Sequence, residues 1–111
     1  MKENAYQTEV IKKLRLLFVG CVILKNDSTY MQGVPDLLIL FENKWAMLEV
    51  KAAKDSPIQP NQEFYVNQFS DMSFAAFIYP ENEEVVFNAL QRTFQTSRTT
   101  RVSKRKQTSL G

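Results

Sequence analysis

Histidine is absent from the 111-residue chain, and cysteine occurs only once, at position 21. The missing histidine excludes histidine general bases, Ser-His-Asp triads and His-ligated zinc. A single cysteine excludes an intramolecular disulfide and a four-cysteine metal site. Because Cys21 lies in the apolar run 18–24, we expect it to be a buried small side chain and not a nucleophile. Any catalysis must therefore rest on carboxylates, lysine, tyrosine, amides or a hard metal ion.

Long apolar runs are also lacking. No stretch approaches the roughly 20 residues that a membrane-spanning helix needs, and the first residues, Met1 to Asn4, lack the apolar segment of a secretory signal. We expect a protein that is not secreted, binds no membrane and lies in the cytoplasm, or in the host cytoplasm if its source is a virus. The length fits one domain, and eight Phe, four Tyr and one Trp can furnish its core.

Acidic residues are missing from the last part of the chain. Residues 1–90 carry 8 Lys/Arg and 12 Asp/Glu, whereas residues 91–111 carry 6 Lys/Arg and no acid. Segment 96–111 has too few aliphatic side chains to offset the entropy of ordering. We therefore expect a folded domain over 1–95 and a flexible basic tail over 96–111, which contacts either a nucleic acid or a protein partner. The candidate nucleic-acid-binding residues of the tail are Arg98, Arg101, Lys104, Arg105 and Lys106.

Hydrophobic periodicity predicts an α/β domain. Apolar residues recur at three- and four-residue steps over 4–18, which predicts a helix. A second helix over 60–72 is predicted from Pro60 and an acidic residue in its first turn, with Phe64, Phe69 and Met72 on its apolar face, and a closing helix is predicted over 81–95. Strands are predicted over 21–24, 34–41, 45–53 and 73–79, with a hairpin across the turn 42–44. The order α-β-β-β-α-β-α indicates a mixed central β-sheet flanked by helices. Aromatic residues that we expect in the core, rather than in a base-stacking platform, are Phe64, Tyr65, Phe69, Phe74 and Phe77.

Three charged side chains are predicted to meet at one end of the hairpin. Residues two apart on a strand share a face, so Glu49 and Lys51 project side by side. Pairing about the turn 42–44 places residue i opposite residue 86 − i, which sets Asp36 opposite Val50 and within one position of Glu49 and Lys51. The alternative interpretations are a solvated strand face for Glu49 and Lys51, and a simple turn residue for Asp36.

Two adjacent carboxylates repel each other unless one is protonated or a cation lies between them. Mg²⁺ is typically held by one or two carboxylates together with water and substrate phosphate oxygens. A metal ion so held lowers the pKa of a bound water and neutralises charge that develops on phosphorus. Asp36, Glu49 and Lys51 therefore suit phosphodiester hydrolysis without histidine.

The motif Gly-Val-Pro-Asp at 33–36, followed by Glu-Val-Lys at 49–51, resembles the PD-(D/E)xK nuclease superfamily. Together with Ser-Pro-Ile-Gln-Pro-Asn-Gln at 56–62, it most resembles the stand-alone VRR-NUC branch, a relative of Holliday-junction resolvases. The resemblance covers residues 5–90 and implies a restriction-endonuclease-like core. It implies an endonuclease that uses Mg²⁺ or Mn²⁺ to cut DNA, including branched and four-way-junction DNA.

The same resemblance assigns roles to individual residues. Asp36 and Glu49 would ligate the metal, with the backbone carbonyl of Val50 as a further ligand, and Lys51 would be the catalytic lysine. Gln62 on the following helix would support the metal-bound water or the scissile phosphate, with a helix-surface amide as the alternative. Glu9 on the first helix would be an additional acid, although exposed helical glutamates are common.

Two symmetric cuts in a four-way junction need two active sites, so the resemblance also implies a homodimer. A non-catalytic nucleic-acid-binding module on a nuclease fold is the main alternative. A small structural protein that assembles on nucleic acid is another. Both alternatives leave the pairing of Asp36 with Glu49 unexplained. An assay for metal-dependent cleavage of a plasmid distinguishes a nuclease from either alternative.

Overall fold

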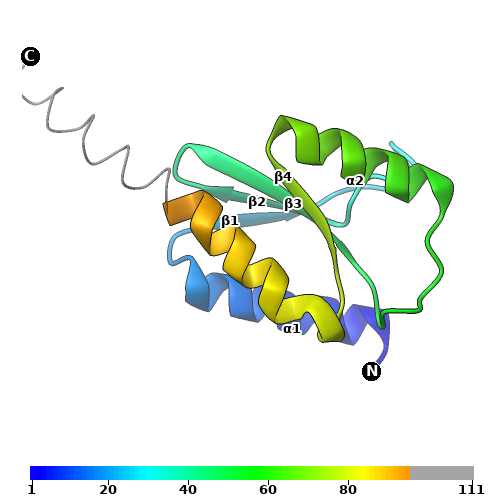
Figure 1. The fold of residues 1–111 in the computed structure, drawn as a ribbon, viewed down its shortest axis with the longest axis horizontal. Helices are drawn as coiled ribbons and strands as arrows, with labels where there is room; N and C mark the ends of the chain where they lie inside the picture. The colour runs from blue at the N-terminus through cyan, green and yellow to red at the C-terminus, as the bar shows by residue number, and fades with distance from the viewer. Residues whose placement is uncertain (96–111) are drawn as a thin grey trace, which may run out of the picture.

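The computed structural model describes residues 1–95, in which a four-stranded sheet lies between helices on both of its faces (Figure 1). The elements are α1 (Glu3–Leu17), β1 (Val22–Lys25), β2 (Leu37–Phe41), β3 (Lys44–Val50), α2 (Pro60–Met72), β4 (Phe74–Ile78) and a 3₁₀ turn, η1 (Pro80–Asn82). A third α-helix follows over 83–95. The predicted α/β class and element order are confirmed.

The sheet is mixed, with the strand order β1-β2-β3-β4. Strands β1, β2 and β3 pair antiparallel, and α2 connects β3 to β4, which pair in parallel. The hairpin between β2 and β3 turns over two residues, 42 and 43, with Glu42 in the left-handed region at φ 56°. This turn is one residue shorter than predicted, so Leu37 pairs with Leu48. The predicted register was therefore wrong by one position, and Asp36 lies next to Glu49 instead of opposite Val50.

The hydrophobic core lies on one face of the sheet. There α1 and the helix over 83–95 cover the alternate residues of the strands, and three phenylalanines meet with ring centroids 5.0 to 5.5 Å apart. Cys21 is half-buried against this core, and burial raises the pKa of its thiol. The fully or nearly buried residues of this cluster include Tyr6, Val10, Leu14, Phe18, Ile39, Leu48, Val86, Phe87, Leu90 and Phe94.

Helix α2 packs on the other face, against β3 and β4. Its only fully buried residue is Val66, whereas Phe64 and Met72 are exposed. The expectation that Phe64 lies in the core was wrong, because the sheet beneath α2 carries the polar Glu49 and Lys51 and gives the helix a narrow apolar contact. The other aromatic residues expected in the core, Tyr65, Phe69, Phe74 and Phe77, are half-buried.

None of the helices within residues 1–95 combines the length and hydropathy required to cross a membrane. The basic segment 96–111 lies outside the described residues, and so do the five cations assigned to it as nucleic-acid contacts.

Candidate active site

Asp36 and Glu49 lie side by side where β2 begins and β3 ends. The backbone N–H of Asp36 donates a hydrogen bond to Glu49 Oε1 at 3.2 Å. In return, the backbone N–H of Val50 donates to Asp36 Oδ2 at 2.9 Å. These reciprocal bonds fix both carboxylates against the hairpin backbone, so the predicted meeting of Asp36 and Glu49 is observed.

Lys51 follows the last residue of β3 and joins the same cluster. Its backbone N–H donates to the Ile78 carbonyl at 2.9 Å, which continues the pairing with β4 beyond the strand. Its ammonium Nζ lies 3.7 Å from Glu49 Oε2 and donates to the Pro57 carbonyl at 3.0 Å. Glu49 is only 3% exposed and Lys51 7%. The alternative of a solvated strand face for these two side chains was therefore wrong.

Gln62, in the first turn of α2, bridges the carboxylate and the ammonium. Its Oε1 accepts from Lys51 Nζ at 2.8 Å, and its Nε2 donates to Glu49 Oε2 at 3.0 Å. The same Oε1 also accepts from the backbone N–H of Gln59 at 3.0 Å, which satisfies a donor at the start of the helix. One amide therefore orients two site residues and anchors α2 above them.

Burial and mutual repulsion disfavour two negative charges in this cluster. Burial, followed by the charge of Asp36, raises the pKa of Glu49 to about 7, although Lys51 and the Asp36 N–H act in the opposite direction. Burial also raises the pKa of Asp36, against the lowering effects of the Val50 N–H and Lys51. Lys51 therefore does not fully compensate the pair, and a further cation would favour the ionised form of both.

The donor set fits a hard divalent cation. Mg²⁺ and Mn²⁺ prefer oxygen ligands, and one or two carboxylates are the usual protein contribution to a Mg²⁺ site that also binds phosphate. The backbone N–H of Val50, which is not a metal ligand, donates to Asp36 Oδ2 and fixes that carboxylate. Within residues 1–95, however, no group of three or more Asp, Glu, Cys or His side chains is placed to share a metal.

The structure does not bring Glu9 into this cluster. Glu9 is exposed on α1 and acts electrostatically on Tyr6, whereas Glu3, at the start of α1, is the helix acid that raises the pKa of Glu49. Glu3 was missed because helix periodicity does not show how closely the first turn of α1 approaches the hairpin.

Two residues of the loop between β1 and β2 also position the site: Asn26, which was missed from the sequence, and Gly33, which belongs to the motif at 33–36 but was given no structural role. The Asn26 backbone N–H donates to the Asp36 carbonyl, and its side-chain amide donates to the Pro35 carbonyl, both at 2.8 Å. Gly33 has a φ of +92°, and a Cβ there would lie 2.6 Å from Cγ of Asn61 in α2. The loop before Asp36 is thus held against the first turn of the helix that carries Gln62.

This contact predicts that Gly33→Ala lowers the free energy of unfolding by about 3 kcal/mol, since it combines a left-handed alanine with a steric clash. Gly20→Ala is the matched control, because Gly20 has the same φ of +92° but open space around its Cβ position. We expect Gly20→Ala to cost only about 1 kcal/mol, the conformational part alone. Urea denaturation measures both, and equal losses would contradict the packing of Gly33 on α2.

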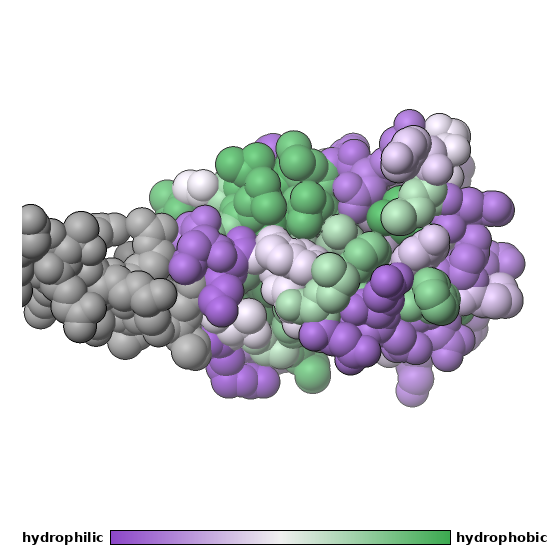
Figure 2. All heavy atoms as spheres, turned by 90° about the horizontal axis from the view of Figure 1, so that it is seen from above, coloured by the Kyte–Doolittle hydropathy of each residue, from purple (hydrophilic) through white to green (hydrophobic). Residues whose placement is uncertain are grey.

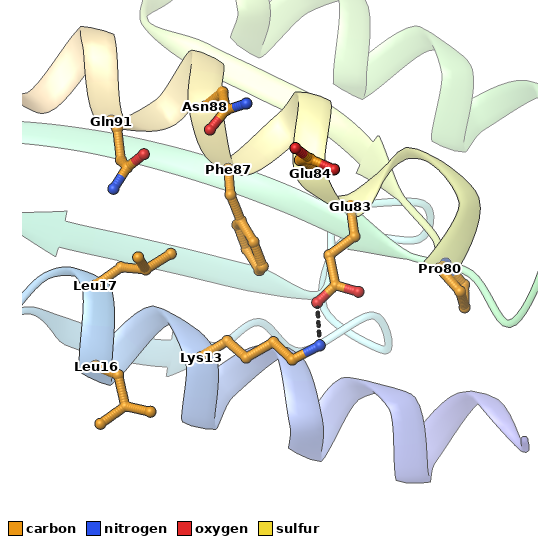
Figure 3. A pocket seen from close by; sticks show the side chains of 9 residues that line it. All are labelled: Lys13, Leu16, Leu17, Pro80, Glu83, Glu84, Phe87, Asn88 and Gln91. Atoms are coloured by element: carbon orange, nitrogen blue, oxygen red, sulfur yellow. Dashed lines mark hydrogen bonds and ion pairs between the residues drawn. The ribbon is translucent and has the colours of Figure 1, made fainter.

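The groove drawn in Figure 3 is a separate feature. It lies between α1 and the helix over 83–95, has a volume of about 570 Å³, and is crossed by an ion pair of 2.6 Å between Lys13 and Glu83. Neither Asp36 nor Glu49 lines it. The cluster at the end of the hairpin is therefore the candidate active site, because it gathers the carboxylates with raised pKa values.

The sheet order and the helices on both faces define an α/β domain whose carboxylate–lysine cluster lies at one end of the β2–β3 hairpin. A solved structure described as a VRR_NUC domain matches with a TM-score of 0.64 and 18% sequence identity, covering 78% of this chain and 94% of that chain. The structure of Hjc, a Holliday junction resolvase from the archaeal hyperthermophile Archaeoglobus fulgidus, matches with a TM-score of 0.48 and 14% identity over 68% of this chain and 67% of that one. No family model and no curated protein sequence matches the chain. The protein thus has a VRR-NUC-like fold.

Proposed function

We propose that the protein is a metal-dependent endonuclease that hydrolyses phosphodiester bonds of DNA, with branched and four-way-junction DNA as candidate preferred substrates. The observation that carries this proposal is the buried network of Asp36, Glu49, Lys51 and Gln62. Buried carboxylates with raised pKa values beside a lysine are costly for stability, and such arrangements concentrate at functional sites.

In this proposal, Asp36, Glu49 and the Val50 carbonyl hold a Mg²⁺ or Mn²⁺ ion. The ion supplies Lewis-acid stabilisation of the phosphate charge and a water of lowered pKa. Lys51 turns its ammonium from Glu49 and Gln62 toward the scissile phosphate or the attacking water. Gln62 holds the side chains of Lys51 and Glu49 in a fixed relative orientation through its two hydrogen bonds. We further propose that the active form is a homodimer, because paired cuts in a junction require two such clusters.

Cleavage of supercoiled plasmid, flap DNA and four-way-junction DNA, with Mg²⁺, with Mn²⁺ and with a chelator, tests the function. We expect divalent-dependent nicking that Asp36→Asn and Glu49→Gln abolish. Glu63→Gln is the matched control, because Glu63 is exposed in the first turn of α2. DNA binding by the wild-type protein without any cleavage would favour the non-catalytic binding module instead.

The basic segment 96–111 is expected to supply most of the nonspecific attraction to DNA, because residues 1–90 are net acidic. Replacing Arg98, Arg101, Lys104, Arg105 and Lys106 by glutamine should reduce the slope of log K against log salt by about three to five units if three to five of them contact phosphates. The single-turnover rate at saturating protein should stay near the wild-type value. A chain with glutamine at the exposed Lys12, Lys25 and Lys44 serves as the control. An unaltered slope in the tail variant would favour a protein partner for this segment.

A further inference from the structure

A small hollow lies in the loop that joins β1 to β2, shortly before the candidate active site. It has a volume of about 420 Å³, within the usual range for pockets that bind small ligands. The residues that line it are Asn26, Asp27, Tyr30, Met31 and Val34. None of them belongs to the carboxylate–lysine cluster, so the hollow is a feature that the proposed reaction does not use.

Hydrogen bonds fix the position of the hollow relative to Asp36. The Asn26 side-chain amide and backbone N–H donate to the carbonyls of Pro35 and Asp36, both at 2.8 Å. From Asn26 the chain reaches Tyr30 through a single turn, which places the Tyr30 backbone within about 15 Å of Asp36. One strand of duplex DNA rises 3.4 Å per nucleotide. A base in the hollow is therefore within about four nucleotides of the phosphate at the site.

The loop holds its shape through its own hydrogen bonds. The N–H groups of Tyr30 and Met31 donate to the Asp27 carbonyl at 3.2 and 3.3 Å. The Val34 N–H donates to the Met31 carbonyl at 3.1 Å. In addition, the N–H and the hydroxyl of Thr29 donate to Asp27 Oδ1 at 2.8 and 2.5 Å. A loop that is already ordered loses little conformational entropy when a ligand binds.

Tyr30 gives the hollow an uncovered aromatic ring. It is 90% exposed, although the backbone around it is fixed. Figure 1 draws this loop at the right-hand end of the sheet, and Figure 2 shows that hydrophilic residues predominate at the same end, with hydrophobic ones scattered among them. A protein partner requires a contiguous apolar patch, whereas a single nucleobase needs only one aromatic face on which to stack.

The charge of the hollow favours a base over a phosphate. Asp27 is its only residue that is charged at neutral pH, and the hydrogen bonds from Thr29 lower the pKa of the Asp27 carboxyl. This carboxylate repels phosphate but accepts hydrogen bonds from the amino groups of cytosine, adenine and guanine. A carboxylate can accept about four hydrogen bonds, and Thr29 supplies two. Only an unpaired base can offer its face to Tyr30 and its pairing edge to Asp27 together.

We propose that this hollow binds an unpaired nucleobase of the substrate, stacked on Tyr30 with its amino group bonded to Asp27. The site selects nucleic acid that has unpaired bases within about four nucleotides of the scissile phosphate, such as flaps and overhangs, over blunt duplex. The inference rests on the proposed function for nucleic acid as the ligand. It does not depend on cleavage, because binding is measured without a metal ion.

Fluorescence anisotropy in the presence of a chelator tests this site with two labelled DNA probes of equal duplex length. One probe is blunt, and the other carries a short single-stranded cytosine overhang. We expect the wild type to bind the overhang probe more tightly. Tyr30→Ala should weaken overhang binding by about 10- to 100-fold, the usual contribution of base–aromatic stacking, and leave blunt-duplex binding unchanged. Tyr30→Phe keeps the ring and should bind like the wild type.

Phe64→Ala is the matched control, because Phe64 is an aromatic residue of α2 that is 60% exposed and does not line the hollow. It should bind both probes like the wild type. Asp27→Asn keeps an oxygen for Thr29 but loses the negative charge. It should therefore reduce the preference for a cytosine overhang over a thymine overhang, because thymine has no amino group.

Equal wild-type affinity for the blunt and overhang probes would overturn the proposal. So would a loss of overhang binding in Phe64→Ala with none in Tyr30→Ala, because that result would place the base on α2. A wild-type protein that shows Tyr30-dependent overhang binding but cleaves no DNA with Mg²⁺ or Mn²⁺ would contradict the nuclease proposal alone. Failure of the base site and failure of the nuclease proposal therefore give different results.

Discussion

Lys51→Ala should reduce the single-turnover rate of DNA cleavage by about a thousandfold while the protein still binds Mn²⁺. An ammonium placed at a reacting phosphate or its water typically contributes two to four orders of magnitude. The Lys51 ammonium pairs with Glu49 but has no oxygen atom that could ligate a metal ion. Removing the Lys51 side chain therefore leaves the metal ligands Asp36 and Glu49 in place. Lys51→Met fills more of the buried space and should show the same loss. Rapid-quench kinetics at saturating Mg²⁺ and saturating protein measure the chemical step.

Lys54 provides the control for Lys51. It lies three residues further along the chain and is exposed, so Lys54→Ala should cleave at nearly the wild-type rate. Gln62→Ala should fall between these variants, with a loss of about 10- to 100-fold, because Gln62 acts by orienting Lys51 and Glu49. Near-wild-type cleavage by both Lys51 variants would show that the assigned site does not perform the reaction.

The carboxylate–lysine cluster could be predicted from the sequence because it depends on local rules. Alternation on β3 places Glu49 and Lys51 on one face, and a tight hairpin brings Asp36 back to them whatever the exact turn length. The one-residue error in register came from the turn, because Glu42 adopts a left-handed φ that nothing in its residue type indicates. The error was small because a slip of one position still leaves Asp36 next to Glu49 or Val50.

What the sequence did not predict depends on contacts between distant segments. The resemblance placed Gln62 in the site, but its hydrogen bond with Lys51 and the approach of Gly33 to Asn61 form only after α2 has docked on the sheet. No periodicity encodes that docking. The aromatic residues of α2 were placed in the core because apolar spacing shows that a face exists and not what covers it. Helix α2 packs mainly against β3 and β4, and Met72 at its end stays exposed.

Glu49→Gln should stabilise the metal-free protein and remove much of its dependence on pH between about 4.5 and 7. The pKa of Glu49 is raised from 4.5 to about 7 in the folded state, mainly by burial and then by Asp36. A carboxyl group with a raised folded pKa favours folding fully below its unfolded pKa, and this contribution disappears as the pH rises through the folded pKa. At pH 8 the ionised Glu49 should therefore destabilise the metal-free fold by about 3 kcal/mol, a cost that the neutral amide of Glu49→Gln avoids.

Divalent cations should reverse this effect in the wild type. Binding to the folded state alone stabilises by about 2.7 kcal/mol at a metal concentration one hundred times the dissociation constant. Mn²⁺ should thus raise the melting temperature more at pH 8 than at pH 5.5, where Glu49 is protonated. Asp36→Asn and Glu49→Gln should each lose the shift, whereas Glu9→Gln should keep it, because Glu9 is exposed and outside the cluster. Thermal melts of the four proteins at both pH values measure these shifts. An equal Mn²⁺-induced shift in all four proteins would show that the metal does not bind at Asp36 and Glu49.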